Sequence, residues 1–290
     1  MSTWAIPLAV AAAAAWAVGM TAAKPALRSW DSLSYLLWRW VMVAALALLY
    51  AGVSGQLAIP GWRPALLAVL AGVVDAAAGG FLYVTALERT SAYRATTLSN
   101  TAPFWGVLAA VAFLGEPLGW GVLVAAGLVV AGAWFLTEPR AASAKAPDLF
   151  GTVLALATGI LWGFAETVPS KLALEEGLAP AMLLFLIAVS GVLSVWVFVP
   201  LLRRRIPRRI GRQGFGFVTL SAVGGAFLGW ILWLVGLDLA PASVLSPVRG
   251  ATMIFAFAYS VVFLKERPTR RAFLGLALVA AGVFLVVFVF

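Results

Sequence analysis

Four ionisable side chains stand inside long apolar stretches of this 290-residue chain, namely Arg39, Asp75, Glu166 and Arg249. On insertion scales, a charge at the centre of a membrane-spanning helix costs about 2.5–3.5 kcal/mol. Such residues persist where they pair with an opposite charge or face a water-filled cavity, so they mark a functional site in a membrane protein. The chemistry they can supply is ion pairing with the charged ends of a solute, or the uptake and release of a proton.

The depths of these residues predict how they pair. At about 1.5 Å per residue, Arg39 and Asp75 share a level ~12 Å from one membrane face, and Glu166 and Arg249 lie within about 6–12 Å of the other face. We therefore predict two charge pairs, Arg39–Asp75 and Glu166–Arg249, one near each mouth of a cavity, with Asp75 and Arg39 in coupling or gating. The alternative is that the pairs only fix helix register and contribute little net stability.

Glu166 is the strongest single candidate for a substrate contact. It follows Trp162 by four residues, which puts both side chains on one helix face, and it precedes Pro169, which loosens a helix locally. A carboxylate beside an aromatic ring suits an ammonium group, through ion pairing and cation–π attraction. The predicted substrate-binding set is Glu166, Trp162, Trp16, Asn100, Arg249, Tyr83 and Trp233.

Proline-associated polar segments interrupt two of the apolar stretches. Asn100 lies in the run Ser99–Pro103, and its counterpart in the second half, Gly250, comes three residues after Pro247. Main-chain carbonyls freed at such kinks can bind a ligand. A kink without a ligand role is an equal alternative.

The composition excludes most other kinds of protein. Hydrophobic residues make up 63% of the chain and charged residues 11%, against roughly 25% charged residues in a soluble domain. The chain has no cysteine and no histidine, which removes thiol chemistry and the commonest metal ligand. We therefore expect a polytopic membrane protein that is not an enzyme, with no catalytic residue, metal or cofactor. Basic patches interleaved with surface aromatics are absent, which argues against nucleic-acid binding.

The elements that must position the four charges are membrane-spanning helices. A helix needs about 20 apolar residues to cross a ~30 Å hydrocarbon core, and ten segments qualify. They are Trp4–Ala22, Ser32–Gly52, Pro64–Leu87, Thr96–Leu114, Trp120–Leu136, Phe150–Val168, Ala179–Leu202, Phe215–Leu237, Val244–Leu264 and Phe273–Phe290. The predicted fold is an all-α membrane protein with a five-helix repeat over 1–137, a polar linker over 138–148 and a second five-helix repeat over 149–290.

The two halves repeat each other in sequence. Residues 79–137 align with 229–287 at a constant offset of 150, and Glu116 falls on Glu266 in a matching tight turn, where capping and loop hydrogen bonds are expected. An odd number of spans per repeat makes the second half insert upside down, so the repeats are inverted about a pseudo-two-fold axis around a central cavity. Aromatic residues also match across the halves, with helix packing or lipid contact as their alternative role: Trp16 with Trp162, and Tyr83 with Trp233.

The charges of the loops predict the orientation. Of the 20 Lys and Arg residues, 16 fall in the loops after the odd-numbered spans and two, Arg63 and Lys171, on the opposite side. Because cytoplasmic loops carry the excess of Lys and Arg, we expect the odd-numbered loops in the cytoplasm and both termini outside a cell (inner) membrane.

The order of these features resembles a known family. Ten helices in two homologous halves, a Trp-rich first helix ending near Lys24, and the turns Gly115-Glu116 and Lys265-Glu266 before the last helix of each half resemble the EamA family of the drug/metabolite transporter superfamily. The resemblance implies a ten-helix basket in which the fifth and tenth helices pack outside the cavity. It also implies small metabolites such as amino acids as substrates. Family members usually keep both termini in the cytoplasm, so the charge bias departs from that pattern.

These observations favour a secondary transporter working by alternating access. The predicted substrate is a small polar or zwitterionic metabolite, an amino acid or amine, moved by a proton-coupled or passive carrier. Two alternatives stay open, a carrier for a quaternary ammonium such as choline and a non-transporting membrane scaffold or receptor. The expected partners are a small-molecule substrate and the lipid bilayer, with no nucleic acid, and either a monomer or a homodimer fits.

Overall fold

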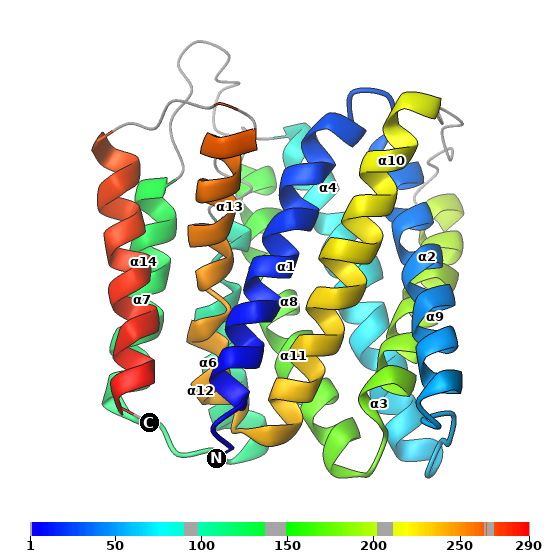
Figure 1. The fold of residues 1–290 in the computed structure, drawn as a ribbon, viewed down its shortest axis with the longest axis horizontal. Helices are drawn as coiled ribbons and strands as arrows, with labels where there is room; N and C mark the ends of the chain where they lie inside the picture. The colour runs from blue at the N-terminus through cyan, green and yellow to red at the C-terminus, as the bar shows by residue number, and fades with distance from the viewer. Residues whose placement is uncertain are drawn as a thin grey trace.

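A computed structural model describes residues 2–89, 98–136, 149–201, 211–263, 265 and 270–289. Within these ranges the chain forms helices and short connections, without a β-strand. The helices stand side by side as a single bundle (Figure 1). The predicted linker over 138–148 lies outside the described residues.

The first half contributes two long helices, a helix interrupted by a π-helical segment, and two further helices. The π-helical segment η1 joins α3 and α4 without a break. The bounds are α1 (Ala5–Ala26), α2 (Ser32–Val53), α3 (Trp62–Gly72), η1 (Val73–Gly79), α4 (Gly80–Arg89), α6 (Ala102–Leu114) and α7 (Trp120–Leu136).

The second half follows the same order among the described residues, except that α12 stands as an additional short helix before α13. A second π-helical segment, η2, joins α10 and α11 at the corresponding place. The bounds are α8 (Leu149–Glu175), α9 (Pro180–Leu201), α10 (Arg212–Leu220), η2 (Ser221–Phe227), α11 (Leu228–Leu239), α12 (Ala242–Val248), α13 (Ala251–Phe263) and α14 (Arg270–Val289).

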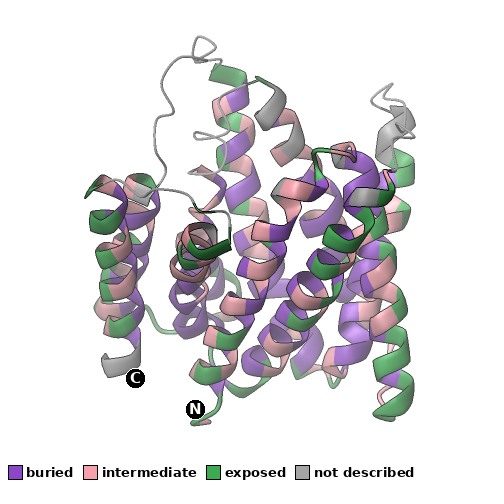
Figure 2. Cartoon of the chain, turned by 45° about the horizontal axis from the view of Figure 1, so that its top comes forward, coloured by how far each residue is buried: buried purple, intermediate pink, exposed green. Residues whose placement is uncertain are grey.

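Seven helical stretches among the described residues are long and apolar enough to cross a membrane. They are 5–23, 33–53, 62–83, 149–175, 180–197, 214–239 and 242–263, and two shorter apolar helices cover 102–114 and 120–135. Large apolar side chains such as Val53, Val197 and Phe284 are exposed on the outside of the bundle (Figure 2). An apolar exterior on helices whose backbone bonds are satisfied internally is what a bilayer requires, so the chain is a multi-pass membrane protein.

Two of the predicted spans differ from the observed helices because of proline. The predicted span Val244–Leu264 is two helices, since α12 carries Pro247 and ends at Val248 before α13 starts. The predicted span Phe150–Val168 instead continues through Pro169 to Glu175. Proline cannot donate to the carbonyl four residues before it, but Ser170 Oγ donates to that carbonyl, Ala165 O, at 2.9 Å.

A tryptophan from the opposite half packs closely against each of the two π-helical segments. A Cβ on Gly79, at the end of η1, would lie 2.6 Å from Trp162 Nε1, and one on Gly229, just after η2, would lie 2.4 Å from Trp16 Cδ1. Only a residue without a side chain allows this approach. Equivalent contacts thus join α8 to the first half and α1 to the second.

The last helix of each half lies apart from the cavity. Helices α7 and α14 pack against each other along their length and form one side of the bundle (Figure 1). This is the position that the family resemblance implies for the fifth and tenth helices. The remaining helices are therefore those available to enclose a site.

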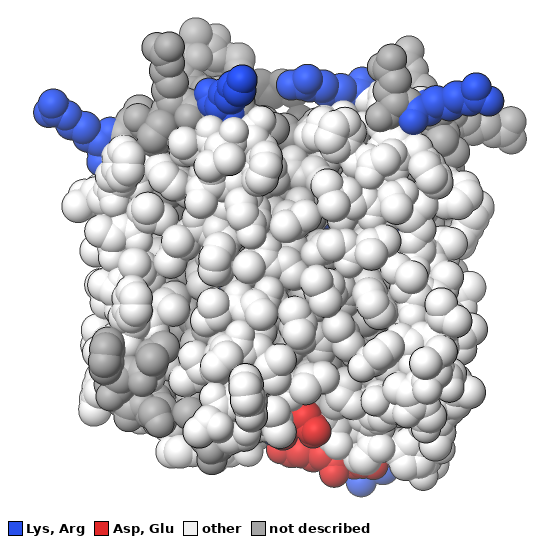
Figure 3. Space-filling model, in the orientation of Figure 1, with Lys and Arg blue, Asp and Glu red and all other residues white. Residues whose placement is uncertain are grey.

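The two ends of the bundle differ in charge. Lys and Arg side chains line the upper rim in Figure 3, and we call this end the basic face; it includes Arg28, Arg212, Arg270 and Arg271. Both termini lie at the other end (Figure 1), which we call the opposite face and which includes Gln56, Glu116 and Glu176. Positive charge is therefore concentrated at one end of the bundle axis, the basic face.

Candidate functional site

A cavity of about 340 Å³ lies within the bundle. On α1 and its C-cap the lining runs from Trp16 to Leu27, and on α2 from Tyr35 to Trp40, so both helices contribute the halves nearer the basic face. The lining residues Met20 and Leu27 are 47% and 43% exposed. The cavity therefore opens on the basic face.

Most of the residues predicted from sequence gather around this cavity. They come from α1, α2, η1, α4, α8, the segment before α6 and the bend between α12 and α13. Eight of the nine line the cavity: Trp16, Arg39, Asp75, Tyr83, Asn100, Trp162, Glu166 and Arg249.

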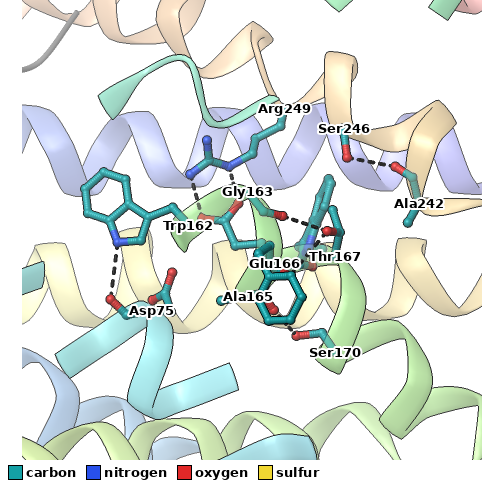
Figure 4. Close-up of polar contacts among 12 residues, drawn as sticks. Asp75, Trp162, Gly163, Ala165, Glu166, Thr167, Ser170, Ala242, Ser246 and Arg249 are labelled. Carbon is teal, nitrogen blue, oxygen red and sulfur yellow. Dashed lines mark hydrogen bonds and ion pairs between the residues drawn. The ribbon is translucent and has the colours of Figure 1, made fainter. Parts of the chain in front are cut away.

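Glu166 and Arg249 form an ion pair, as predicted from their depths. Arg249 Nη2 donates to Glu166 Oε1 at 2.6 Å, and Arg249 Nε contacts Glu166 Oε2 (Figure 4). The Glu166 side chain is 6% exposed and the Arg249 side chain 18%. Arg249 lies in the turn that follows α12, which ends at Val248, and precedes α13. Each charge therefore neutralises the other inside the membrane.

Arg39 and Asp75 do not form the predicted ion pair. Both line the cavity, but among the described residues neither side chain has a charged partner within ion-pair distance. Asp75 is buried in η1, and Arg39 Nε is buried without a hydrogen-bond partner in the described part of the chain. An unpaired charge at this depth is costly, so a charged solute can stabilise both groups, and a proton can neutralise Asp75.

The predicted placement of one pair at each mouth is also wrong. All four charged residues line the same cavity, which opens on the basic face. Depth along a helix axis does not specify which way a side chain points. It therefore could not show that all four residues face one cavity that opens on the basic face.

Aromatic rings form two walls of the cavity. On one side, Trp162 Nε1 donates to the main-chain oxygen of Asp75 at 3.2 Å, and its ring lies 5.4 Å from that of Tyr83 (Figure 4 shows Trp162 against Asp75). On the other, Trp16 lies 6.1 Å from Trp230, and the guanidinium of Arg249 lies 5.5 Å from the Trp16 ring. The site thus combines charges of both signs with aromatic surface.

Trp233 is the predicted site residue that the structure places elsewhere. It is fully buried, with its Nε1 donating to the main-chain oxygen of Glu166 at 3.0 Å. Its ring lies 5.6 Å from Trp16, at an interplanar angle of 46°. The repeat counterpart of this contact, Tyr83 with Trp162, has rings 5.4 Å apart at 45°. Trp233 therefore supports Trp16 and Glu166 and does not reach the cavity.

The structure adds lining residues that sequence reasoning missed. Trp40, whose ring lies 5.6 Å from the Arg39 guanidinium, adjoins that charge in sequence. Thr252 follows Arg249 by three residues, a spacing that shares a helix face, and its Oγ1 is buried without a hydrogen-bond partner in the described ranges. Helical spacing from Arg249 could have found Thr252, whereas Trp40, the immediate neighbour of Arg39, does not share its helix face by spacing. Across the described residues, no cluster of three acidic side chains could hold a metal ion.

Comparison with known proteins gives a family and a fold. The family model described as the EamA-like transporter family matches residues 3–138 and again 149–288. None of the curated proteins compared matches the chain. One solved structure, titled only as the crystal structure of a protein, has 17% sequence identity and a TM-score of 0.82 over 100% of this chain and 98% of that one. At this identity, the likeness shows a shared fold.

Proposed function

The chain belongs to the EamA-like transporter family, and we propose that it moves a small polar or zwitterionic metabolite, an amino acid or an amine, across the membrane by alternating access. The single observation that carries this proposal is the cavity, in which Asp75 and Arg39 have no ion-pair partner among the described residues while Glu166 and Arg249 neutralise each other. A ligand that brings both a cation and an anion can satisfy the two unpaired groups together. The cavity volume of about 340 Å³ lies in the range of small-molecule sites, roughly 300–1,000 Å³.

In this proposal Arg39 binds the carboxylate of the solute and Asp75 binds its ammonium group. Arg39 presents a planar guanidinium, which matches a carboxylate, and its Nε has no other hydrogen-bond partner among the described residues. Asp75 lies beside Trp162, whose ring lies 5.4 Å from that of Tyr83, and aromatic rings supply cation–π attraction to an ammonium group. Glu166 and Arg249 then act mainly as a neutral pair that holds α8 to the bend after α12.

Asp75 is also the proposed carrier of a coupling proton. The chain has no histidine, so a proton relay must use carboxylates, and Glu166 already faces Arg249. A proton and an ammonium group would compete for the same Asp75 oxygens. Competition of this kind couples solute movement in one direction to proton movement in the other.

The proposed architecture is ten spanning helices in two inverted repeats, over 1–137 and 149–290, joined by the linker 138–148. Three matched features support it: the segments η1 and η2, the Trp162–Gly79 and Trp16–Gly229 contacts, and the ring pairs at 5.4 and 5.6 Å. Inverted repeats place a binding site at their interface, and rocking of one repeat against the other alternates its access.

We further propose that the basic face is cytoplasmic and that both termini lie outside the cell membrane. The Lys and Arg side chains along one rim support this orientation (Figure 3). A cavity open on the basic face is then open to the cytoplasm, the state in which an exporter loads its solute.

Uptake into proteoliposomes tests the proposed function. Liposomes containing the purified chain are preloaded with unlabelled amino acid, and entry of the labelled amino acid is followed by counterflow. We expect saturable exchange that is lost in Asp75→Asn, with empty liposomes as the blank. No exchange with any zwitterionic amino acid or amine, by protein that is folded in the membrane, would overturn the proposal and favour a scaffold or receptor.

A quaternary ammonium substrate is the second candidate, favoured by the Trp16, Trp40 and Trp230 rings in the cavity lining. Aromatic surface is the usual means of binding such cations. Choline has no carboxylate, so its transport would not depend on Arg39. Exchange of labelled choline that is unchanged in Arg39→Gln would select this alternative.

A further inference from the structure

Glu116 joins the two halves of the chain at the opposite face. This side chain lies in the turn between α6 and α7, and its two oxygens accept hydrogen bonds from consecutive main-chain N–H groups of α12. Ala242 N donates to Oε1 and Ser243 N to Oε2, both at 2.7 Å. The contact spans 126 residues of sequence. The expected capping role of this glutamate is thus fulfilled on a helix of the other half.

The sequence around α12 explains why an outside acceptor is needed. The first N–H groups of a helix have no partner within the helix and are normally satisfied by the side chain of the residue that precedes it. That residue is Pro241, which has no acceptor on its side chain. A carboxylate that receives two N–H groups makes charge-assisted bonds, which are stronger than bonds between neutral groups. Glu116 therefore holds the start of α12 firmly.

The contact lies at the end of the bundle away from the cavity mouth. The cavity opens on the basic face, while the turn that carries Glu116 lies at the opposite face (Figure 1). A second side chain of the first half, Gln56, accepts from Ala181 N of the second half at 3.2 Å at the same end. These hydrogen bonds join the first half of the chain to the second at the opposite face. They must break if the two halves are to separate there and open the cavity on that side.

Helix α12 also connects Glu116 to the charges of the cavity. All seven of its residues are buried, and it packs against α6. The bend that carries Arg249 follows directly after Val248, and Arg249 is paired with Glu166. Movement of α12 away from Glu116 would therefore also move Arg249.

We propose that Glu116 is a latch for the opposite face: its carboxylate holds α12 while the cavity opens on the basic face and releases it when the cavity opens on the other side. The inference rests on transport by alternating access, as proposed above. Glu116 does not touch the solute in this scheme. It is a positioning residue that acts through α12 and Arg249, and its loss changes which face is open.

The natural absence of cysteine allows a direct test. A single reporter, Met20→Cys, places a thiol in the cavity lining at a side chain that is 47% exposed. The rate of its reaction with a membrane-impermeant maleimide is measured from each face, in right-side-out and inside-out vesicles. The same reporter is then combined with Glu116→Gln, in which an amide NH₂ replaces one of the two accepting oxygens. The matched control is Glu176→Gln, at the same face but paired with Arg63 at 3.4 Å.

We expect Glu116→Gln to raise the labelling rate from the opposite face about tenfold, which corresponds to ~1.4 kcal/mol in the equilibrium between the two states. The labelling rate from the basic face should fall. The control, Glu176→Gln, should match the parent in the labelling rate from either face. If Glu116→Gln does not fold, Glu116→Asp, which keeps the charge but shortens the reach, takes its place with the same expectation. A folded variant whose labelling from the opposite face is unchanged overturns the latch.

The readout needs no substrate, so the two proposals can fail separately. Unchanged labelling together with amino-acid exchange by the parent protein refutes the latch and keeps the transporter. Altered labelling without exchange of any solute keeps a latch between two conformations but refutes the proposed function.

Discussion

The Glu166 carboxylate and the Arg249 guanidinium meet inside the bundle through a 2.6 Å hydrogen bond and a second close contact. The partners come from α8 and from the bend between α12 and α13, so the pair joins parts of the chain that are 83 residues apart. Removing one partner of a buried pair leaves the other charge without compensation, whereas removing both does not. Stability and solute binding can therefore be separated at this site.

We expect Glu166→Gln to destabilise the protein by about 3–5 kcal/mol, because Arg249, whose side chain is only 18% exposed, is left unpaired. The double variant Glu166→Gln/Arg249→Gln should recover most of that loss. Thermal unfolding in detergent measures the stability of the single and of the double variant. Glu176→Gln is the surface control, since its ion pair with Arg63 is partly exposed, at 29% for Glu176 and 69% for Arg63, and surface pairs contribute about 0–1 kcal/mol. A double variant no more stable than the single one would contradict the pairing.

Asp75→Asn should behave differently from Glu166→Gln. Because the Asp75 carboxylate has no ion-pair partner among the described residues, its neutral amide should fold with near-parental stability. Because Asp75 binds both the solute and the proton in the proposed function, amino-acid exchange and its proton coupling should be lost together. A pH-sensitive dye inside proteoliposomes should report a pH change during amino-acid movement by the parent and none with Asp75→Asn. Amino-acid movement by the parent without any pH change would show a passive carrier.

Gly79→Ala tests the contact between the halves. The added methyl group would lie 2.6 Å from Trp162 Nε1, so the indole must shift, and overpacking of this kind costs about 1–3 kcal/mol. The neighbouring change Gly80→Ala is the control, because its nearest new contact is an oxygen at 3.9 Å. Equal melting temperatures for the two variants would show that Trp162 adapts without cost.

The sequence could predict what depends on apolar length and on spacing along a helix. Apolar stretches located the helices, and the depths of Glu166 and Arg249 located their ion pair. Asp75 could not be placed in this way, because it lies in a π-helical segment that no apolar periodicity reveals. Extra residues in a π-helix rotate the side chains that follow, so a 3.6-residue period no longer predicts which face they share.

Contacts between the halves were beyond sequence reasoning for a different reason. The position of Glu116 in a tight turn predicted a cap, but its partners Ala242 and Ser243 lie on a helix far away in sequence. Trp233 was expected in the cavity because it matches Tyr83, yet it lies fully buried behind Trp16. Repeat counterparts share a backbone position, whereas the side chains around them differ between the halves.

The central claim is that Arg39 and Asp75 bind opposite ends of one solute. The most direct measurement compares the affinity of the purified protein for an amino acid and for the amine that lacks its carboxylate, in the parent, Arg39→Gln and Asp75→Asn. A hydrogen bond to a charged group is worth about 1.5–3 kcal/mol, or roughly 10–100-fold in affinity. Arg39→Gln should weaken the amino acid by that factor and leave the amine unchanged, while Asp75→Asn should weaken both. Equal losses for both solutes in Arg39→Gln, or unchanged affinities in Asp75→Asn, would contradict the claim.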